Sequence, residues 1–259
     1  LVQKADLEKL YEGDSYYEAM SKLYKKSEEW GPASWVGFNN IGFDEKFTRM
    51  GLYKSLHNQY ITNTNGNTRA DILPLMHYMK FFYPNFINFP MNDEGKPIFK
   101  LDRIAPANNI NHRAHRSMGD VIATIELCKL VQQKTPDLWF HAMNDTKKMD
   151  VLKKADELNV FCYGKYDRNR EPDFSAYAFV GINNKMNNEL LVFNLEYDMN
   201  EYLDLDIETM TKLVRKTDGP FKIIKANESP ILLPVEFAPL IKKEFKKEKL
   251  LQDSYFIKN

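Results

Sequence analysis

The sequence predicts an α/β domain followed by a β-rich domain, and two observations support this order. Apolar residues before Thr135 recur mainly at helical spacing, with one short strand-like run among them. After Pro136, runs rich in β-branched and aromatic residues alternate with turn-forming residues, which is typical of strands. A chain of 259 residues has room for two ordinary domains. We expect the boundary between them near residues 134–150.

The first domain is expected to contain several helices around a single strand. Gly31-Pro32 ends a helical pattern over residues 7–30, and a short buried strand follows over residues 33–38. Further helical patterns cover 44–56, 72–82, 100–104 and 117–133. Asp71 is suited to the N-cap of the helix over 72–82.

The pattern over 117–133 is the most regular helical pattern in the sequence. One apolar face of this helix is formed by Met118, Val121, Ile122, Ile125 and Cys128. Such a stripe is typical of a helix that packs against a core.

The second domain is expected to be built mainly from strands. The predicted strands lie over 160–166, 174–182 and 189–195 and within 221–233. Residues 183–188 form a turn-like connector between two of them. Asp206 is placed to cap a helix over 207–214, and a lysine-rich amphipathic helix is predicted over 238–251.

The composition excludes several classes of protein. Apolar residues make up 43% and charged residues 28% of the sequence, the balance of a soluble globular protein. No run approaches the ~20 apolar residues that span a bilayer, and no apolar signal segment is present, so we expect no membrane partner. Cys128 and Cys162 lack CxxC spacing, which argues against a disulfide framework or a zinc site, so we expect a reducing, cytoplasmic setting.

The charge balance adds little about partners. Lys+Arg and Asp+Glu each total 36, so the net charge is zero and any phosphate-binding surface must be local. The sequence starts at Leu1 within a polar, helix-like stretch, from which we expect a fragment of a longer protein.

Three residues suggest a phosphodiesterase site. Asp44 follows the strand-like run, and His115 and Asp120 lie at the start of the most regular helix. Hydrolysis of a phosphodiester requires an activated water and positive charge beside the phosphoryl oxygens, which two divalent ions ~4 Å apart supply. Carboxylates hold Mg²⁺ or Mn²⁺, and a nearby histidine can take the proton of the attacking water.

Each of these residues also has a simpler explanation. Asp44 can cap the helix that follows it, and Asp120 can be a solvated acid of a first helical turn. His115 can belong to a basic loop with His112, and the two histidines could bind zinc only with a third ligand that the sequence does not indicate.

The surrounding motifs resemble those of exonuclease I, the DEDDh-type 3′→5′ single-stranded DNA exonuclease of the RNase H-like superfamily. Residues 36–49, VGFNNIGFDEKFTR, resemble its second exonuclease motif, and residues 115–125, HRSMGDVIATI, resemble its third. Further similar stretches follow in the same order at 69–71, 92–95, 99–101, 191–195, 203–206 and 227–232. The resemblance covers roughly residues 30–235.

This resemblance implies a fold and a domain organisation. It implies an N-terminally truncated α/β RNase H-like exonuclease domain over 1–135 and a small β-rich SH3-like barrel domain over 136–240. The start of a truncated helical region would then occupy 241–259. The implied activity is two-metal hydrolysis of single-stranded DNA from the 3′ end to 5′-mononucleotides.

The resemblance also implies roles for individual residues. Asp44 and Asp120 would hold Mg²⁺ or Mn²⁺, and His115 would be the general base. Asn39, Arg69 and Asp71 would lie near the substrate. Arg168 belongs either to a solvated hairpin or to a loop that contacts phosphate. The implied partners are single-stranded DNA and single-strand-binding protein.

The sequence departs from the family in two places. Ser117 replaces the small alanine of the third motif, and the DxE of the first motif has no match. Asp6 and Glu8 have the right spacing but lie in a helix-patterned stretch with no strand before it. We therefore expect the metal to be weakly held or absent and the chain alone to be inactive, whereas its parent protein is a nuclease.

Two other functions remain open. One is a non-catalytic module of nuclease-like fold that binds single-stranded nucleic acid. The other is a nuclease that acts on RNA or on short oligonucleotides, against which the barrel-like second domain argues.

Overall fold

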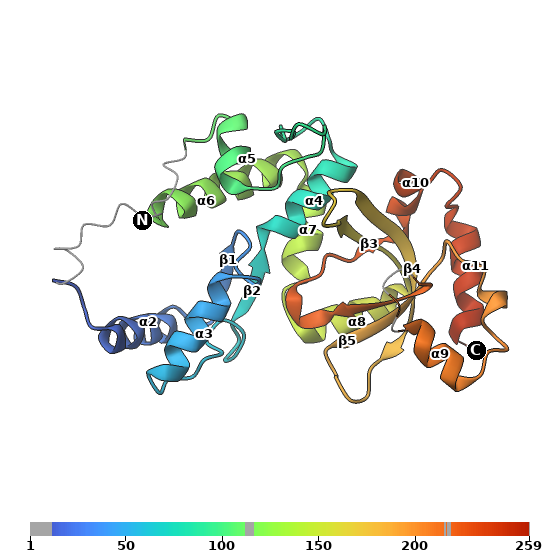
Figure 1. Cartoon of the computed structure of the whole chain (residues 1–259), viewed down its shortest axis with the longest axis horizontal. Helices are drawn as coiled ribbons and strands as arrows, with labels where there is room; N and C mark the ends of the chain where they lie inside the picture. The colour runs from blue at the N-terminus through green and yellow to red at the C-terminus, as the bar shows by residue number, and fades with distance from the viewer. Residues whose placement is uncertain (1–11, 112–116, 215, 217–218, 259) are drawn as a thin grey trace. The chain divides into compact units, whose positions relative to one another are not determined.

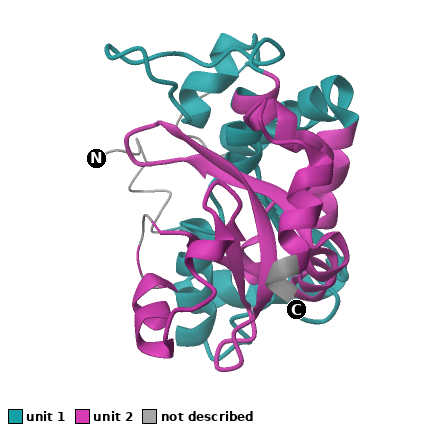
Figure 2. Cartoon of the chain, turned by 90° about the vertical axis from the view of Figure 1, so that its right-hand side faces the viewer, with its two compact units in different colours: residues 1–80, 84–136 teal, residues 81–83, 137–259 magenta. Residues whose placement is uncertain are grey.

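A computed structural model describes residues 12–111, 117–214, 216 and 219–258. Within it the chain forms two compact units, which Figure 2 distinguishes by colour. Unit 1 comprises residues 1–80 and 84–136, and unit 2 comprises residues 81–83 and 137–259. No helix among the described residues is long and apolar enough to cross a membrane.

The first helix among the described residues of unit 1 is α2 (Tyr16–Trp30), which starts at a capping box. The side chain of Ser15 accepts a hydrogen bond from the backbone N–H of Glu18 at 3.3 Å, and the Glu18 carboxylate accepts one from the N–H of Ser15 at 2.9 Å. These reciprocal bonds satisfy two donors that a helix N-terminus otherwise leaves unpaired. The helix therefore begins at residue 16.

Two short parallel strands form the sheet of unit 1 (Figure 1). β1 (Ser34–Gly37) pairs with β2 (Thr68–Asp71), so that Gly37 lies opposite Asp71. The strand over 33–38 was expected, whereas β2 was not. Four residues are too few to establish a period of two, and the buried Arg69 conceals the strand in any hydrophobicity pattern.

Four further helices lie among the described residues of unit 1. They are α3 (Asp44–Lys54), α4 (Ile72–Phe82), α5 (Leu101–Ala107) and α6 (Ser117–Lys134). α4, whose last two residues belong to unit 2, supplies much of the core through the fully buried side chains of Leu75, Met76 and Met79. The expected helices over 44–56, 72–82 and 117–133 are therefore present, with ends that shift by a residue or two.

The face that α6 buries differs from the expected one. Ala123, Leu127 and Val131 are fully buried, whereas Val121 and Ile122 are about half exposed. Four members of the predicted apolar face are exposed, namely Met118, Val121, Ile122 and Ile125, and Cys128 is half-buried. α6 thus has two apolar faces, and helical periodicity alone cannot indicate which of them meets the core.

Two helices that helical periodicity did not predict precede the sheet of unit 2. They are α7 (Pro136–Asn144) and α8 (Lys148–Leu158). Pro136, the first residue of α7, still belongs to unit 1. Each is short and buries only a few apolar side chains, such as Leu138 and Ala142 of α7. Apolar residues of these helices recur at i, i+4 spacing, but each helix is too short for that spacing to stand out in the sequence.

A five-stranded antiparallel sheet follows these helices in unit 2. Its strands are β3 (Val160–Tyr166), β4 (Pro172–Ile182), β5 (Glu189–Asn194), β6 (Phe221–Lys225) and β7 (Leu233–Pro234), in the spatial order β6-β5-β4-β3-β7. Val151 and Ala155 of α8 pack on one face of the sheet against Phe161, Val192 and Ile224. This cluster is the core of unit 2.

Short helices connect and follow the strands. They are η1 (Met199–Glu201), α9 (Ile207–Val214), η2 (Ala226–Glu228), η3 (Val235–Phe237), α10 (Ala238–Ile241) and α11 (Lys247–Lys258). Asp206 accepts a hydrogen bond from the N–H of Thr209 at 2.9 Å, as expected of the cap of α9. The single helix expected over 238–251 was wrong, because α10 ends at Ile241 and α11 begins only at Lys247.

Candidate active site

The ends of β1 and β2 bring the polar residues of unit 1 together. The strands are parallel, so the turn that follows Gly37 and the residue that ends β2, Asp71, lie at the same edge of the sheet. A Cβ at Gly37 would lie 2.7 Å from the Cβ of Asn40, so this turn requires glycine there. The turn leads directly into α3, which begins with Asp44.

Asp71 holds this turn in place. Its carboxylate accepts hydrogen bonds from the backbone N–H groups of Asn39 at 2.7 Å and of Ile41 at 3.2 Å. It also accepts one at 3.0 Å from the N–H of Leu73, in the first turn of α4. The capping role expected of Asp71 is confirmed, and the same side chain also ties the turn after β1 to the end of β2.

Asn39 adopts the conformation that this turn demands. Its φ is 59°, a left-handed value that asparagine tolerates better than most residues. Its carbonyl accepts a hydrogen bond from the N–H of Phe43 at 3.1 Å, one residue before α3. Asn39 therefore lies within the predicted site as a turn-forming residue.

Asp44 is exposed at the start of α3. The N-cap position is occupied by Phe43 and has no side-chain hydrogen bond, so the interpretation of Asp44 as a helix cap is wrong. Within the described residues, no hydrogen bond or ion pair engages its carboxylate. A carboxylate in this state is available to a ligand outside the chain.

The negative charge of Asp44 acts on the carboxyl group of Asp71. Burial is the main cause that raises the pKa of Asp71, and the negative charge of Asp44 raises it further. The three backbone N–H donors oppose this rise, because they favour the ionised form. The turn after β1 thus places two carboxylates close enough to interact.

Glu45 is a residue of this region that the sequence analysis missed. It is 5% exposed, and its carboxylate forms ion pairs with Arg69 and, at 3.0 Å, with Arg49. The hydroxyl of Thr62 donates a further hydrogen bond to it at 2.9 Å. Arg69 itself is 4% exposed, so its guanidinium is engaged inside the unit. The signal in the sequence was the adjacent pair Asp44 and Glu45, because neighbouring helical residues point in different directions and one of the two can face the interior.

The other residues singled out from the sequence are Asp120, His112, His115 and Arg168. Asp120 is half-buried in the first turn of α6, and its carbonyl accepts a hydrogen bond from the hydroxyl of Thr124 at 2.8 Å. His112 and His115 lie outside the described residues. Arg168 is exposed in the turn between β3 and β4 of unit 2.

The described part of the chain contains no preformed metal centre. No group of three or more His, Cys, Asp or Glu side chains in it is arranged to hold a metal ion. Asp44 and Asp120 nevertheless offer hard oxygen donors of the kind that Mg²⁺ and Mn²⁺ prefer.

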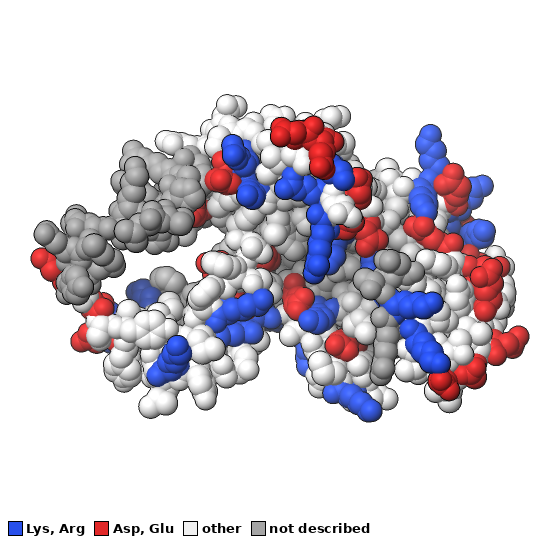
Figure 3. All heavy atoms as spheres, in the orientation of Figure 1, with Lys and Arg blue, Asp and Glu red and all other residues white. Residues whose placement is uncertain are grey.

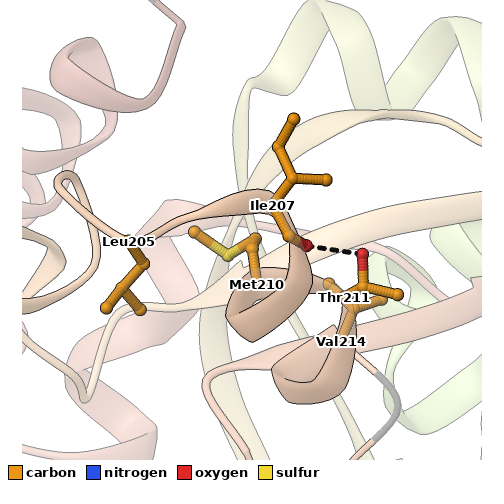
Figure 4. Close-up of a pocket in the computed structure, with 5 residues that line it drawn as sticks. All are labelled: Leu205, Ile207, Met210, Thr211 and Val214. Carbon is orange, nitrogen blue, oxygen red and sulfur yellow. Dashed lines mark hydrogen bonds between the residues drawn. The ribbon is translucent and has the colours of Figure 1, made fainter.

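A hollow lies on unit 2 beside α9. It measures about 310 Å³ and is lined by residues of α9 and the segment before it: Leu205, Ile207, Met210, Thr211 and Val214. Figure 4 shows that the hydroxyl of Thr211 is turned to the carbonyl of Ile207, with which it forms a 2.7 Å hydrogen bond. None of these described lining residues carries a titratable side chain.

Comparison with known proteins reveals sequence relatives that share one description. The chain is 32% identical over 227 residues to exodeoxyribonuclease I of Buchnera aphidicola from Acyrthosiphon pisum, which covers 81% of this chain and 52% of the relative. It is 30% identical over 211 residues to exodeoxyribonuclease I of Escherichia coli, with 76% and 44% covered. The chain thus spans about half the length of the curated relatives it matches. No family model matches the sequence.

Solved structures share the fold. E. coli exonuclease I in complex with a dA16 oligonucleotide superimposes with a TM-score of 0.78 at 22% identity, covering 95% of this chain and 56% of that one. A complex of exonuclease I with a C-terminal peptide of single-strand-binding protein gives a TM-score of 0.74 at 24% identity, with 95% and 56% covered.

The fold and the sequence relatives together define the chain as a relative of the α/β nucleases. Its particular relatives are the exodeoxyribonucleases I, so the resemblance based on the motifs around Asp44 and Asp120 is confirmed.

Proposed function

We propose that the chain is part of a 3′→5′ exodeoxyribonuclease that degrades single-stranded DNA to 5′-mononucleotides. The observation that carries this proposal is the exposed carboxylate of Asp44, held at the edge where both parallel strands end by a turn that Asp71 fixes. The sequence relatives support the same conclusion.

Within this proposal, Asp44 and Asp120 hold Mg²⁺ or Mn²⁺. A bound divalent ion supplies positive charge to the phosphoryl oxygens and makes a water nucleophilic. His115 takes the proton of the attacking water. Asp71 acts on Asp44 through the turn, since its oxygens are engaged by three backbone N–H groups.

Within this proposal, Asn39 and Arg69 act by positioning Asp44. Asn39 shapes the turn before Asp44, and Arg69 neutralises Glu45 beside it. Both residues therefore act on the substrate through the placement of Asp44. The supporting observation is that the Arg69 guanidinium is buried in its ion pair.

We propose further that the two units correspond to an RNase H-like domain and an SH3-like barrel. Five antiparallel strands with one irregularity in register between Phe179 and Gly181 support a strongly curved sheet in unit 2. Arg168 would contact phosphate from the turn between its first two strands. Single-strand-binding protein is a second proposed partner, because the exonuclease I of a solved complex binds its C-terminal peptide.

The test is digestion of a 5′-labelled single-stranded oligonucleotide by the longer parent protein in the presence of Mg²⁺. We expect a ladder that shortens from the 3′ end, and no ladder with the variants Asp44→Asn, Asp120→Asn or His115→Ala. Duplex DNA and RNA of the same sequence serve as competing substrates. Mg²⁺-independent binding of the oligonucleotide without any cleavage would instead establish a non-catalytic binding module.

A further inference from the structure

α3 carries an exposed row of large apolar side chains that begins beside Asp44. Phe43, Phe47, Met50 and Tyr53 are 57%, 66%, 53% and 65% exposed, respectively. The first three follow the i, i+4, i+7 spacing of one helix face, and Tyr53 lies one turn after Met50 on its flank. We call these four residues the α3 ridge.

The ridge is not the face by which α3 is anchored in unit 1. The helix buries Glu45, Gly51 and Leu52. A Cβ at Gly51 would lie 2.5 Å from the sulfur of Met20, so α2 packs closely against that side. α3 is therefore anchored in unit 1 through its other side chains, and the α3 ridge lies on the exposed side of a packed helix. A contiguous apolar surface of this kind indicates an interaction site.

Aromatic rings dominate the ridge, and two of them are already arranged as a pair. The ring centroids of Phe43 and Phe47 are 4.9 Å apart at an interplanar angle of 58°. Exposed aromatic rings in this arrangement present π faces on which nucleic-acid bases stack irrespective of sequence.

Cations accompany the rings along the same helix. Lys46 and Lys54 are exposed next to Phe47 and Tyr53, and Figure 3 shows Lys and Arg side chains among uncharged surface in this part of the molecule. Among the described residues, neither ammonium group has an acidic partner. Rings interleaved with unpaired cations match a polymer that alternates bases with phosphates.

We propose that the α3 ridge is a stacking platform that binds single-stranded DNA beyond the nucleotide at Asp44. This inference rests on the proposed function, since it assigns further nucleotides of the same substrate. The bases stack on Phe43, Phe47 and Tyr53, and the phosphates between them contact Lys46 and Lys54. Because stacking is tolerant of sequence, the platform suits an enzyme that degrades any single strand.

The experiment measures binding without cleavage. Anisotropy of a labelled oligothymidylate and of an abasic oligonucleotide of equal length is recorded in EDTA with the full chain. We expect Phe47→Ala to weaken binding of oligothymidylate about tenfold and to leave the abasic ligand unaffected, because only bases can stack. Phe140→Ala is the matched control, since Phe140 is 62% exposed in unit 2 and should change neither affinity.

Salt dependence separates the lysines from the rings. Lys46→Ala and Lys54→Ala should weaken both ligands and each reduce the slope of log K against log salt by ~0.7, whereas Phe47→Ala should leave the slope unchanged. Phe47→Leu removes the ring and retains apolar bulk, so it covers the case in which the alanine variant folds poorly.

The outcomes are distinguishable. If the wild type and both Phe47 variants bind oligothymidylate with equal affinity, the proposed stacking platform is overturned. The same holds if the variants lose equal affinity for oligothymidylate and for the abasic ligand. Either result leaves the proposed function intact. A wild type that binds neither ligand overturns the proposed substrate and the ridge together. Concentration-dependent dimerisation that Phe47→Leu abolishes would show that a second copy covers the ridge, which also overturns it.

Discussion

Arg69 and Glu45 form a buried ion pair that joins β2 to the first turn of α3. Their side chains are 5% and 6% exposed, so both charges have left water. Arg49 and Thr62 complete the surroundings of the Glu45 carboxylate. Since Asp44 directly precedes Glu45 and Asp71 follows Arg69 by two residues, this pair aligns the two segments that carry the candidate site.

Breaking that pair is expected to be costly. Arg69→Met leaves the Glu45 carboxylate buried with fewer donors, and we expect a loss of about 3–5 kcal/mol in the free energy of unfolding. Urea titration followed by circular dichroism measures it. Glu157→Gln is the control, because Glu157 pairs with Lys153 at 3.5 Å in an exposed position where the loss should stay below about 1 kcal/mol. Equal effects of the two changes would contradict a buried, functional pair.

Asp44 and Asp71 should separate activity from stability. Asp44→Asn removes an exposed charge without a partner and should change the free energy of unfolding by about 0.5 kcal/mol or less. In the parent protein it should lower the cleavage rate ~100-fold or more, because the metal ion loses a ligand. Thermal unfolding and the rate of nucleotide release are the two measurements.

Asp71→Asn is the counterpart. One of its oxygens becomes an amide that cannot accept the N–H groups of the turn, so we expect a loss of about 1–3 kcal/mol in stability. A variant at Asp71 that is as stable as the wild type would show that the three backbone bonds do not hold the turn.

Asp145 should make the stability of unit 2 depend on pH. Its carboxylate is fully buried and accepts hydrogen bonds from Lys154 at 2.8 and 2.9 Å and from the N–H of Leu232 at 2.7 Å. Burial raises its pKa to about 6 from an ordinary 3.8, against the lowering effect of Lys154. The folded state therefore binds this proton more tightly than the unfolded state does.

The sign follows from that difference. The stabilising contribution of Asp145 is complete below pH ~3.8 and is lost as the pH rises through ~6, a change on the order of 3 kcal/mol. Asp145→Asn retains an acceptor for Leu232 but cannot titrate. The difference in unfolding free energy between Asp145→Asn and the wild type, variant minus wild type, should therefore increase from pH 4 through pH 5 and 6 to pH 7. A relative fall would mean that Lys154 outweighs burial and lowers the pKa.

The two apolar faces of α6 should respond differently to truncation. Leu127 is fully buried, so Leu127→Ala should cost about 2–5 kcal/mol through the cavity it leaves. Ile125, two residues away on the same helix, is 47% exposed, and Ile125→Ala should cost about 1 kcal/mol or less. Chemical denaturation of both variants compares them directly. A larger loss of unfolding free energy for Ile125→Ala would show that the face predicted from periodicity is the buried one.

Much of the candidate site could be predicted because it rests on short motifs. The stretch around Asp44 and the one from His115 to Asp120 indicate exonuclease I from letters and spacing alone, and the relatives confirm that resemblance. The partner of Asp44 at the strand end was harder to identify. Asp71 lies 27 residues further along the chain, and only the parallel pairing of β1 with β2 places the two residues at one edge.

The sequence by itself determined the main helices, because an apolar stripe of period 3.6 needs no knowledge of distant residues. It also indicated the resemblance to exonuclease I, which the curated relatives bear out, since the motif residues are contiguous. Only the tertiary structure decided which face of α6 is buried, that Arg69 turns inward to Glu45, and that Asp71 anchors the turn before Asp44. The physical reason is that burial and ion pairing depend on neighbours distant in sequence, and helical periodicity carries no record of which neighbour covers a given face.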